Sequence, residues 1–286
     1  MLFRSRVRAD HPLRQISKAV DFTFVRQAVA DRYGSNGNVS VDPSVIMKML
    51  FLLFYDDVPS ERELMKIIPE RLDYMWFLGY GLDDEIPDHS VLSKARTRWG
   101  VEVFETLFLR VVQSCAKAVL VDGKKLHVDG SLVDANASNN SVVKGSTEWI
   151  AALKEAYCVT EKKLDGTPYY EAKNEKMVST TDPDAAIVRK GSLASRTRYT
   201  QHRGVDDARG VITAVETTNG AVAENAKLME MIDQHEQNTG CKVQTVVADK
   251  QYGTAENYRA CQERGLNTHM ADMLESQLEK GRREGI

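Results

Sequence analysis

The sequence predicts an α/β protein with an all-helical N-terminal part, followed by a mixed sheet flanked by helices. Up to about residue 121, apolar residues recur at intervals of three and four between helix start and stop signals. From residue 122 onwards, short runs rich in β-branched residues alternate with helical segments. The domains expected from this change are a helical domain over 1–121 and a sheet domain over 122–286.

Helix signals follow one another through the N-terminal part. Asp42 and Pro43 predict a helix start, because the carboxylate accepts backbone hydrogen bonds and the proline ring fits the first turn. Ser60 and Glu63 form a capping box, so a short helix is expected from there to Pro69. Further helices are expected over 70–78, 88–99 and 101–119, the first two ending at Gly79 and Gly100.

The C-terminal part alternates between strand and helix patterns. A first strand is expected at Leu126–Val128, and residues 136–195 are polar enough to indicate an insertion after it, with one helix near 148–157. The expected elements that follow are a hairpin over 197–203 and 211–218, a helix over 221–238, a strand over 243–248, a helix from Thr254 to Gly265, and a strand over 267–271. This order of strand, hairpin, helix, strand, helix and strand predicts a ribonuclease-H-like sheet.

Composition excludes several classes of protein. The 286 residues are 42% hydrophobic and 28% charged, which is typical of a globular protein. No apolar run is long enough to cross a bilayer and the N-terminus lacks a secretory signal, so no membrane association and a cytoplasmic location are expected. The cysteines are widely spaced, which argues against a zinc site or a disulfide framework (Cys115, Cys158, Cys241 and Cys261).

Charge gives only local hints of a nucleic-acid partner. The net charge of −3 and the pI near 6.1 lack the basic footprint of most DNA-binding proteins. Basic side chains nevertheless gather on one expected helix, at Lys94, Arg96 and Arg98, and Arg203 lies on the expected hairpin. These four are the candidate DNA contacts. The alternatives are a solvated helix face for the first three and a pairing within the sheet for Arg203.

Two aspartates carry the strongest chemical signal. Asp129 belongs to the first strand, and Asp249 directly follows the fourth. If those strands pair in parallel, the two carboxylates become neighbours and can share divalent metal ions, which prefer oxygen ligands. Two such ions stabilise the attacking and leaving oxygens of an in-line displacement at phosphorus. An aspartate at a strand end can instead cap a loop or helix. Asp134 is a more distant substitute for Asp129.

Two histidines have open roles at this stage. His127 and His202 are either contacts to phosphate or to the metal ligands, or structural histidines with satisfied hydrogen bonds.

Several segments together resemble a known family. They are Ala9-Asp10-His11-Pro12-Leu13-Arg14, Pro87-Asp88-His89-Ser90, His127-Val128-Asp129-Gly130-Ser131, His202-Arg203 and Ala248-Asp249-Lys250-Gln251-Tyr252-Gly253. Over nearly the whole chain the sequence resembles the DDE transposases of bacterial insertion sequences.

The resemblance implies a chemistry and a set of partners. In that family three acids bind two Mg²⁺ (or Mn²⁺) ions, and the enzyme cuts transposon-end DNA and joins it to target DNA. It would make Asp129 the first acid and Asp249 the second, with catalytic and metal-binding roles. It also implies DNA partners, namely the terminal inverted repeats and the target, and a homo-oligomer on DNA in the bacterial cytoplasm.

The family's third acid is a glutamate on a helix beyond the last strand. Glu275 and Glu279 lie at a corresponding place, but the residues around them do not match the family's third motif. A C-terminally truncated catalytic domain is therefore expected. The function expected is transposition by metal-dependent DNA cleavage and strand transfer. The alternative is a catalytically inactive, DNA-binding remnant, and a nuclease that cuts without joining shares the same metal site.

Overall fold

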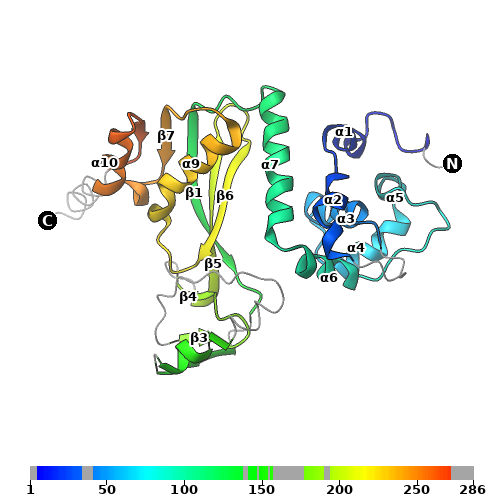
Figure 1. Cartoon of the computed structure of the whole chain (residues 1–286), viewed down its shortest axis with the longest axis horizontal. Coiled ribbons are helices and arrows are strands. Elements are labelled where there is room, and N and C mark those ends of the chain that lie inside the picture. The colour runs from blue at the N-terminus through cyan, green and yellow to red at the C-terminus, as the bar shows by residue number, and fades with distance from the viewer. Residues whose placement is uncertain are drawn as a thin grey trace. The chain divides into compact units, whose positions relative to one another are not determined.

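The chain folds into two compact units in the computed structural model (Figure 1). The structure describes residues 5–33, 41–137, 141–146, 148–153, 155–156, 177–189 and 194–271. Described residues up to Val111 form the first unit, and those from Val112 onwards form the second. The division lies inside helix α7 (Val101–Lys117), on the N-terminal side of the boundary expected at residue 121. No described helix is long and apolar enough to span a membrane.

The first unit is helical, as the sequence predicted. Its helices are α1 (Pro12–Ala19), α2 (Phe24–Ala28), α3 (Pro43–Tyr55), α4 (Glu61–Ile67), α5 (Leu72–Leu78), α6 (Ser90–Trp99) and the start of α7, with short 3₁₀ turns η2 (Ala30–Arg32) and η3 (Ile68–Glu70). Two caps form as expected: the Asp42 side chain accepts from the Ser44 amide and Ser60 from the Glu63 amide. The core includes Met49, Leu52, Leu64, Tyr74 and Trp99, all fully buried.

Three helix boundaries differ from the expected ones, for local reasons. Helix α5 begins at Leu72 because Arg71 is extended after the 3₁₀ turn at Ile68–Glu70. Helix α6 begins at Ser90, where the Asp88 carboxylate accepts the Ser90 amide. Helix α7 ends at Lys117, and Val119 just beyond it adopts a left-handed backbone with φ of 58°.

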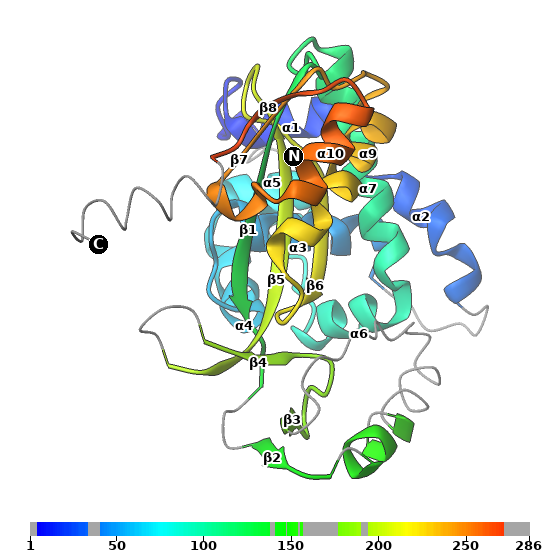
Figure 2. The same cartoon turned by 90° about the vertical axis from the view of Figure 1, so that its left-hand side faces the viewer.

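The second unit contains a mixed sheet with the strand order β6-β5-β1-β7-β8. Its strands are β1 (Lys125–Asp134), β5 (Arg196–Asp206), β6 (Ile212–Asn219), β7 (Thr245–Ala248) and β8 (Asn267–His269). A sixth strand, β4 (Ala186–Val188), pairs with the first residues of β5, next to the part of β5 that pairs with β6. The pairs β1–β5 and β5–β6 are antiparallel, whereas β1–β7 and β7–β8 are parallel. This is the ribonuclease-H-like arrangement that the sequence predicted. Figure 2 shows β1, β5 and β6 as its long strands.

The polar insertion holds strands that the sequence analysis missed. Strand β2 (Val142–Lys144) pairs with β3 (Met177–Ser179) in a separate two-stranded sheet, and β4 joins the main sheet. Each is only three residues long, too short to show an alternating pattern. The helix expected near 148–157 is present over the described residues 148–153 and 155–156.

Helices α9 (Leu228–Thr239) and α10 (Ala255–Glu263) flank the main sheet. The buried core under α9 includes Leu126 and Val128 from β1, Val246 from β7, and Met231 and Ile232 from the helix. In place of a helix over 221–238, the segment starts with the 3₁₀ turn η5 (Glu224–Lys227), which has buried Lys227 as its last residue. Thr254 caps α10 as predicted, by accepting from the Asn257 amide.

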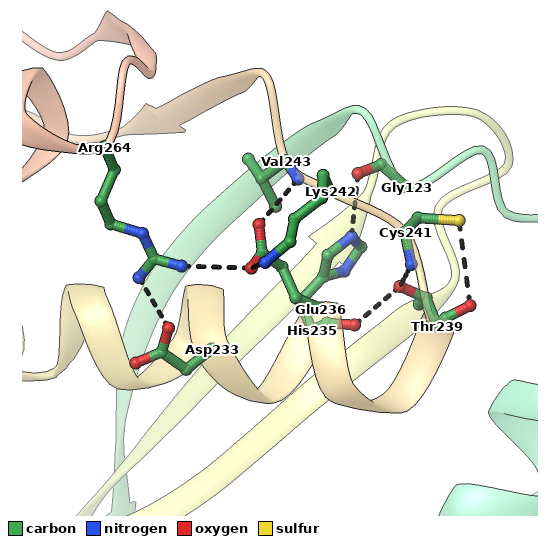
Figure 3. A network of polar contacts seen from close by, with 9 residues as sticks. All are labelled: Gly123, Asp233, His235, Glu236, Thr239, Cys241, Lys242, Val243 and Arg264. Carbon is green, nitrogen blue, oxygen red and sulfur yellow. Dashed lines mark hydrogen bonds and ion pairs between the residues drawn. The ribbon is translucent and has the colours of Figure 1, made fainter.

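An ionic network ties the C-terminal end of α9 to the strand and helix that follow (Figure 3). The Glu236 carboxylate accepts from the Val243 amide at 3.0 Å, from Lys242 Nζ at 2.7 Å and from Arg264 Nη2 at 3.1 Å. Arg264 Nη1 also donates to Asp233 at 2.6 Å. Because the Val243 amide is used in this network, the strand expected from residue 243 begins only at Thr245.

The same end of α9 is anchored to the start of β1. Buried His235 contacts the Gly123 carbonyl through Nε2 at 3.2 Å (Figure 3). Its Nδ1 contacts the Thr213 hydroxyl at 2.6 Å. Gly123 has φ of 71°, and a Cβ there would lie 2.1 Å from Cys241 Cβ. These contacts fix α9 and β7 relative to β1, and thereby the strand ends where both aspartates lie.

Candidate functional site

Asp129 and Asp249 lie at adjacent positions on the paired strands β1 and β7. Val128 and Ala248 are the last register partners of this parallel pair, and each aspartate is the next residue along its strand. Neighbouring strands are roughly 4.8 Å apart. Asp249 retains an extended backbone, with φ of −71° and ψ of 174°. Alternation along the strands therefore directs both side chains to the face opposite the one that α9 covers. Both residues are exposed.

Neither aspartate is neutralised by a cation of the described chain. Asp129 has no hydrogen-bond or ion-pair partner among the described residues. Asp249 Oδ1 accepts the Gln251 amide at 2.8 Å and so caps the 3₁₀ turn η6 (Lys250–Tyr252), but it forms no ion pair with any described residue. The cap uses only one oxygen of Asp249, which leaves lone pairs on both carboxylates for another ligand.

A third carboxylate comes close to this strand end. Glu224, the first residue of η5, packs its side chain on Gly130, the residue after Asp129. A Cβ built on Gly130 would lie 2.6 Å from Glu224 Cγ and 2.9 Å from Glu224 Cδ. Only glycine leaves room for this approach. Sequence reasoning missed Glu224, because nothing in its immediate neighbours marks it as part of a site.

Tyr252 lies beneath the three acids. Its side chain is fully buried, and its hydroxyl has no hydrogen-bond partner within the described structure. Burial raises the pKa of Tyr252 well above its ordinary value, and the negative charges of Glu224, Asp129 and Asp249 raise it further. Tyr252 therefore stays protonated at neutral pH, with a buried O–H group in the field of these carboxylates.

One buried amide joins the segments that carry these groups. Asn257 Nδ2 donates to the carbonyl of Asn225, next to Glu224, at 3.1 Å. It also donates to the carbonyl of Tyr252 at 2.9 Å. Asn257 thus holds η5 against η6, and it keeps the Glu224 segment beside the Asp249 segment.

The donor set fits a hard divalent cation. Carboxylate oxygens at a solvent-facing strand end are the ligands that Mg²⁺ and Mn²⁺ prefer, and the buried Tyr252 hydroxyl without a partner adds a polar group on the inner side. No three His, Cys, Asp or Glu side chains of the described residues already converge on one metal position.

The other candidate ligands are placed elsewhere or already paired. Asp134, at the far end of β1, accepts from Arg196 Nη1 at 2.8 Å and from Arg198 Nε at 2.7 Å. Hydrogen bonds from Arg198 and Arg196 hold the pKa of Asp134 below its usual value. Glu275 and Glu279 lie outside the described residues.

The two histidines of interest have different surroundings. His127 Nε2 contacts Asp207 Oδ1 at 2.6 Å near the start of β1. His202 is fully buried on β5, opposite Gly130, and its Nε2 contacts the Thr218 hydroxyl at 2.9 Å. Burial, aided by the charge of Lys227, lowers the pKa of His202 to about 4, so it is neutral at pH 7. His202 therefore lies beside Gly130 in the middle of the sheet, on the face that α9 covers.

The four candidate DNA contacts are found in both units. In the first unit Lys94 is exposed and has no described partner, Arg96 pairs with Glu61, and the Arg98 guanidinium lies 4.8 Å from the Tyr33 ring centroid. In the second unit Arg203 Nη2 donates to the Ser131 hydroxyl at 2.7 Å. Arg203 therefore forms a hydrogen bond within the sheet, which was the alternative expected for it. It lies opposite Asp129 on the neighbouring strand β1.

Comparisons with solved structures find only a weak likeness. Solved structures with a partial likeness include the "Mos1 transposase paired-end complex with left transposon end", with 8% identity, a TM-score of 0.27, and coverage of 86% of this chain and 64% of that one. Another is the "Mos1 mariner paired end complex with Mn", with 8% identity, a TM-score of 0.24, and coverage of 91% and 68%.

Such TM-scores are too low to support the fold, which rests here on strand order and register. The chain thus spans 64% of the length of the first of these transposases. No curated protein matches the sequence of this chain.

Family models give the firmer result. Residues 2–98 match the model of a transposase domain (DUF772), and residues 175–285 match that of the transposase DDE domain. Together they span most of the chain, and the second includes β7 and Asp249. A helical first unit and a ribonuclease-H-like sheet with two aspartates at adjacent positions on neighbouring strands accompany these matches. The chain belongs to the DDE transposase family.

Proposed function

We propose that this chain is an insertion-sequence transposase that cleaves DNA at transposon ends and transfers the strand to target DNA. Asp129 and Asp249 are its metal-binding and catalytic acids, with Mg²⁺ or Mn²⁺ as cofactor. The observation that carries the proposal is the adjacency of two carboxylates that form no ion pair within the described chain, one midway along β1 and the other directly after the parallel strand β7. The match to the transposase DDE domain supports it.

The residues of the chain have separable tasks in this reaction. The bound ions supply charge stabilisation to the attacking and leaving oxygens of the phosphodiester exchange. Asp129 and Asp249 hold those ions at one place on the sheet. The parallel pairing of β1 with β7 fixes the spacing of the two backbones, and the cap at Gln251 restrains Asp249. A pair of adjoining interior strands suits this task, because small misplacements of reacting groups are costly.

DNA is the proposed partner, both as terminal inverted repeats and as target, with a homo-oligomer assembled on paired ends in the bacterial cytoplasm. Residues 1–121 are proposed as the helical DNA-binding domain and 122–286 as the catalytic domain. Lys94, exposed on α6, is the best-placed candidate of its helix for a phosphate contact, because Arg96 is paired with Glu61. Arg203 is proposed to contact the DNA backbone from beside Asp129.

The test is an end-cleavage and joining assay with the purified full chain. The substrate is labelled duplex DNA carrying the inverted repeats that flank the protein's own gene, with a supercoiled plasmid as target. We expect nicking at the repeat ends and joined products with Mg²⁺ or Mn²⁺, none with EDTA, and none for Asp129→Asn or Asp249→Asn. Asp134→Asn is the matched control, because Asp134 is already paired with arginines, and it should retain cleavage.

Each other result would support a different function for this chain. Salt-sensitive binding to the repeats without any cleavage would identify a catalytically inactive, DNA-binding remnant. Metal-dependent cutting of any DNA, without joined products, would identify a nuclease. Full activity in either Asp129→Asn or Asp249→Asn would remove that residue from the active site.

A further inference from the structure

We propose that Lys250 binds a phosphate of the DNA substrate on one side of the phosphate that is cut, and that Arg203 binds a phosphate on the other side. This inference rests on the proposed function, because it places the cut phosphate at the metal ions of Asp129 and Asp249. It adds Lys250 to the residues that contact DNA, and it gives the cleaved strand a path across the site.

The first observation is that Lys250 is held in place beside one of the acids. It is the first residue of η6 and directly follows Asp249. The turn is held at its start by Asp249 Oδ1, which accepts the Gln251 amide at 2.8 Å. It is held at its end by the fully buried Tyr252, whose carbonyl accepts from Asn257 Nδ2 at 2.9 Å. The backbone of Lys250 is therefore fixed relative to Asp249.

The second observation is that the charge of Lys250 serves no contact within the described chain. Its side chain is exposed and has no hydrogen-bond or ion-pair partner among the described residues. Three lysines elsewhere in the second unit are instead paired with acids, Lys125 with Asp207, Lys227 with Glu216 and Glu230, and Lys242 with Glu236. An unpaired ammonium on a fixed turn, next to a metal-binding acid, suits an anionic ligand from solution.

The third observation is a second cation on the other side of the two acids. Arg203 is the register partner of Asp129 on β5, whereas β7, which leads into Asp249 and Lys250, pairs with the opposite edge of β1. Arg203 Nη2 donates to the neutral Ser131 hydroxyl at 2.7 Å, and the guanidinium forms no ion pair with any described residue. Its charge and its remaining N–H donors are thus open to an anion.

This order of charges matches a DNA backbone that crosses the site. Divalent ions bound at the two acids attract the phosphate that is cut. The phosphates before and after it need cations of their own, which Lys250 and Arg203 supply from opposite sides. Because neighbouring strands are roughly 4.8 Å apart, both cations lie within side-chain reach of one short stretch of backbone. The cleaved strand then passes over β1, between the β5 side and the β7 side.

The test measures how tightly the full chain binds a duplex that carries its inverted repeat, by fluorescence anisotropy over a series of salt concentrations. Ca²⁺ replaces Mg²⁺ so that the duplex stays intact. We expect Lys250→Met to weaken binding about tenfold at low salt, as for the loss of one hydrogen bond to a charged group. The slope of log affinity against log salt should become shallower by about 0.9, the value for one phosphate contact. Arg203→Met should act in the same way.

Two matched controls separate a phosphate contact from changes in overall charge or in folding. Lys124→Met removes another exposed lysine without a described partner, which lies roughly 17 Å before Asp129 along the chain. Ser131→Ala removes the hydrogen bond of Arg203 but keeps its charge. Both should keep the salt slope of the parent. Circular dichroism and the melting midpoint verify folding, and Arg203→Gln is used if Arg203→Met does not fold.

Neutral phosphates identify the position that each cation contacts. A methylphosphonate replaces one phosphate at a time on either side of the cleavage point, which is mapped from the parent's own cleavage. With the methylphosphonate at the phosphate that Lys250 contacts, Lys250→Met should bind as tightly as the parent, because the contact is already lost. The effect of Arg203→Met should disappear only with a methylphosphonate on the other side of the cleavage point.

The outcomes separate this inference from the proposed function. A parental affinity and salt slope in Lys250→Met, or an effect that no methylphosphonate cancels, would overturn the phosphate contact of Lys250. Cancellation of both variants on the same side of the cleavage point would overturn the path across β1. In each case metal-dependent cleavage by the parent would leave the proposed function intact. A parent that neither binds nor cleaves the repeat would overturn the proposed function, and this inference with it.

Discussion

Helix α9 and its preceding turn have acidic groups at both ends, and the two ends treat their charge in opposite ways. At the C-terminal end, Asp233 and Glu236 are paired with Arg264 and Lys242, and Glu236 also accepts a backbone amide (Figure 3). At the N-terminal end, Glu224 lies beside Asp129 and Asp249, and neither aspartate has a cationic partner in the described chain. We call these the closed end and the open end.

The two ends differ in whether their acidic side chains are paired with cations of the chain. Burial by itself would raise the pKa of Glu236, but hydrogen bonds from Lys242 and the Val243 amide, with the charges of Lys242 and Arg264, lower it. The closed end thus contributes stability by satisfying its own acids. At the open end, Asp129 and Asp249 form no ion pair with described residues, and such carboxylates can attract a cation from solution. Ligand sites commonly sacrifice local stability in this way.

The largest effect is expected at the open end, and on function alone. Asp249→Asn or Asp129→Asn should reduce metal-dependent DNA cleavage by at least about a hundredfold, because a metal ligand matters more than the groups that support it. The free energy of unfolding should change by no more than about 0.5 kcal/mol, as for other exposed substitutions. Cleavage assays and urea unfolding measure the two quantities. A large loss of stability would show that these aspartates are structural.

The second effect is a dependence of the free energy of unfolding on pH, which we expect from a histidine behind the open end. Buried His202, behind the open end, has a pKa of about 4, below its ordinary 6.5. The unfolded chain therefore binds the proton first, so stability is full above about pH 6.5 and falls as pH drops towards 4. From pH 7 to pH 5 this loss is about 2 kcal/mol.

Urea unfolding at both pH values measures this loss. The His202→Gln variant should lack it, whatever its stability at pH 7. An equal pH dependence in the variant and the parent would mean that His202 titrates normally.

The third effect tests whether the closed end stabilises the fold. Arg264→Met removes the partner of both Asp233 and Glu236, and should cost about 1–2 kcal/mol, less than for a fully buried pair. The pKa of Glu236 is lowered from 4.5, so its contribution is present above about pH 4.5 and lost as pH falls through the lowered value. The difference between variant and parent should therefore shrink in acid. Thermal unfolding at pH 7 and at about pH 3 tests this sign.

The smallest effect is expected at Lys242, the other cation of the closed end. Its side chain is 86% exposed, against 29% for Arg264, although both contact Glu236. Solvent screens such a pair, so Lys242→Met should cost no more than about 0.5 kcal/mol, and salt should reduce even that. Melting at low and high ionic strength compares the two variants. A cost equal to that of Arg264→Met would contradict the role assigned to burial.

Sequence reasoning succeeded where a feature depends on near neighbours. The caps at Asp42, Ser60 and Thr254 formed as expected, because each needs only a side chain and an amide two or three residues along. It was less accurate where distant partners decide. The sequence left open whether Arg96 and Arg203 pair within the fold, and their partners, Glu61 and Ser131, are both far away in sequence.

The sequence by itself determined the order of the main strands and helices, though not the short strands β2, β3 and β4, and it placed Asp129 and Asp249 after two apolar runs, since these follow from local patterns of apolar residues. Only the tertiary structure decided that Glu224 lies on Gly130, that Tyr252 is buried beneath the acids, and that Asn257 joins their segments. The physical reason is that each of these contacts depends on how the sheet and helices pack, which brings together groups from separate elements. Local propensity carries no information about that geometry.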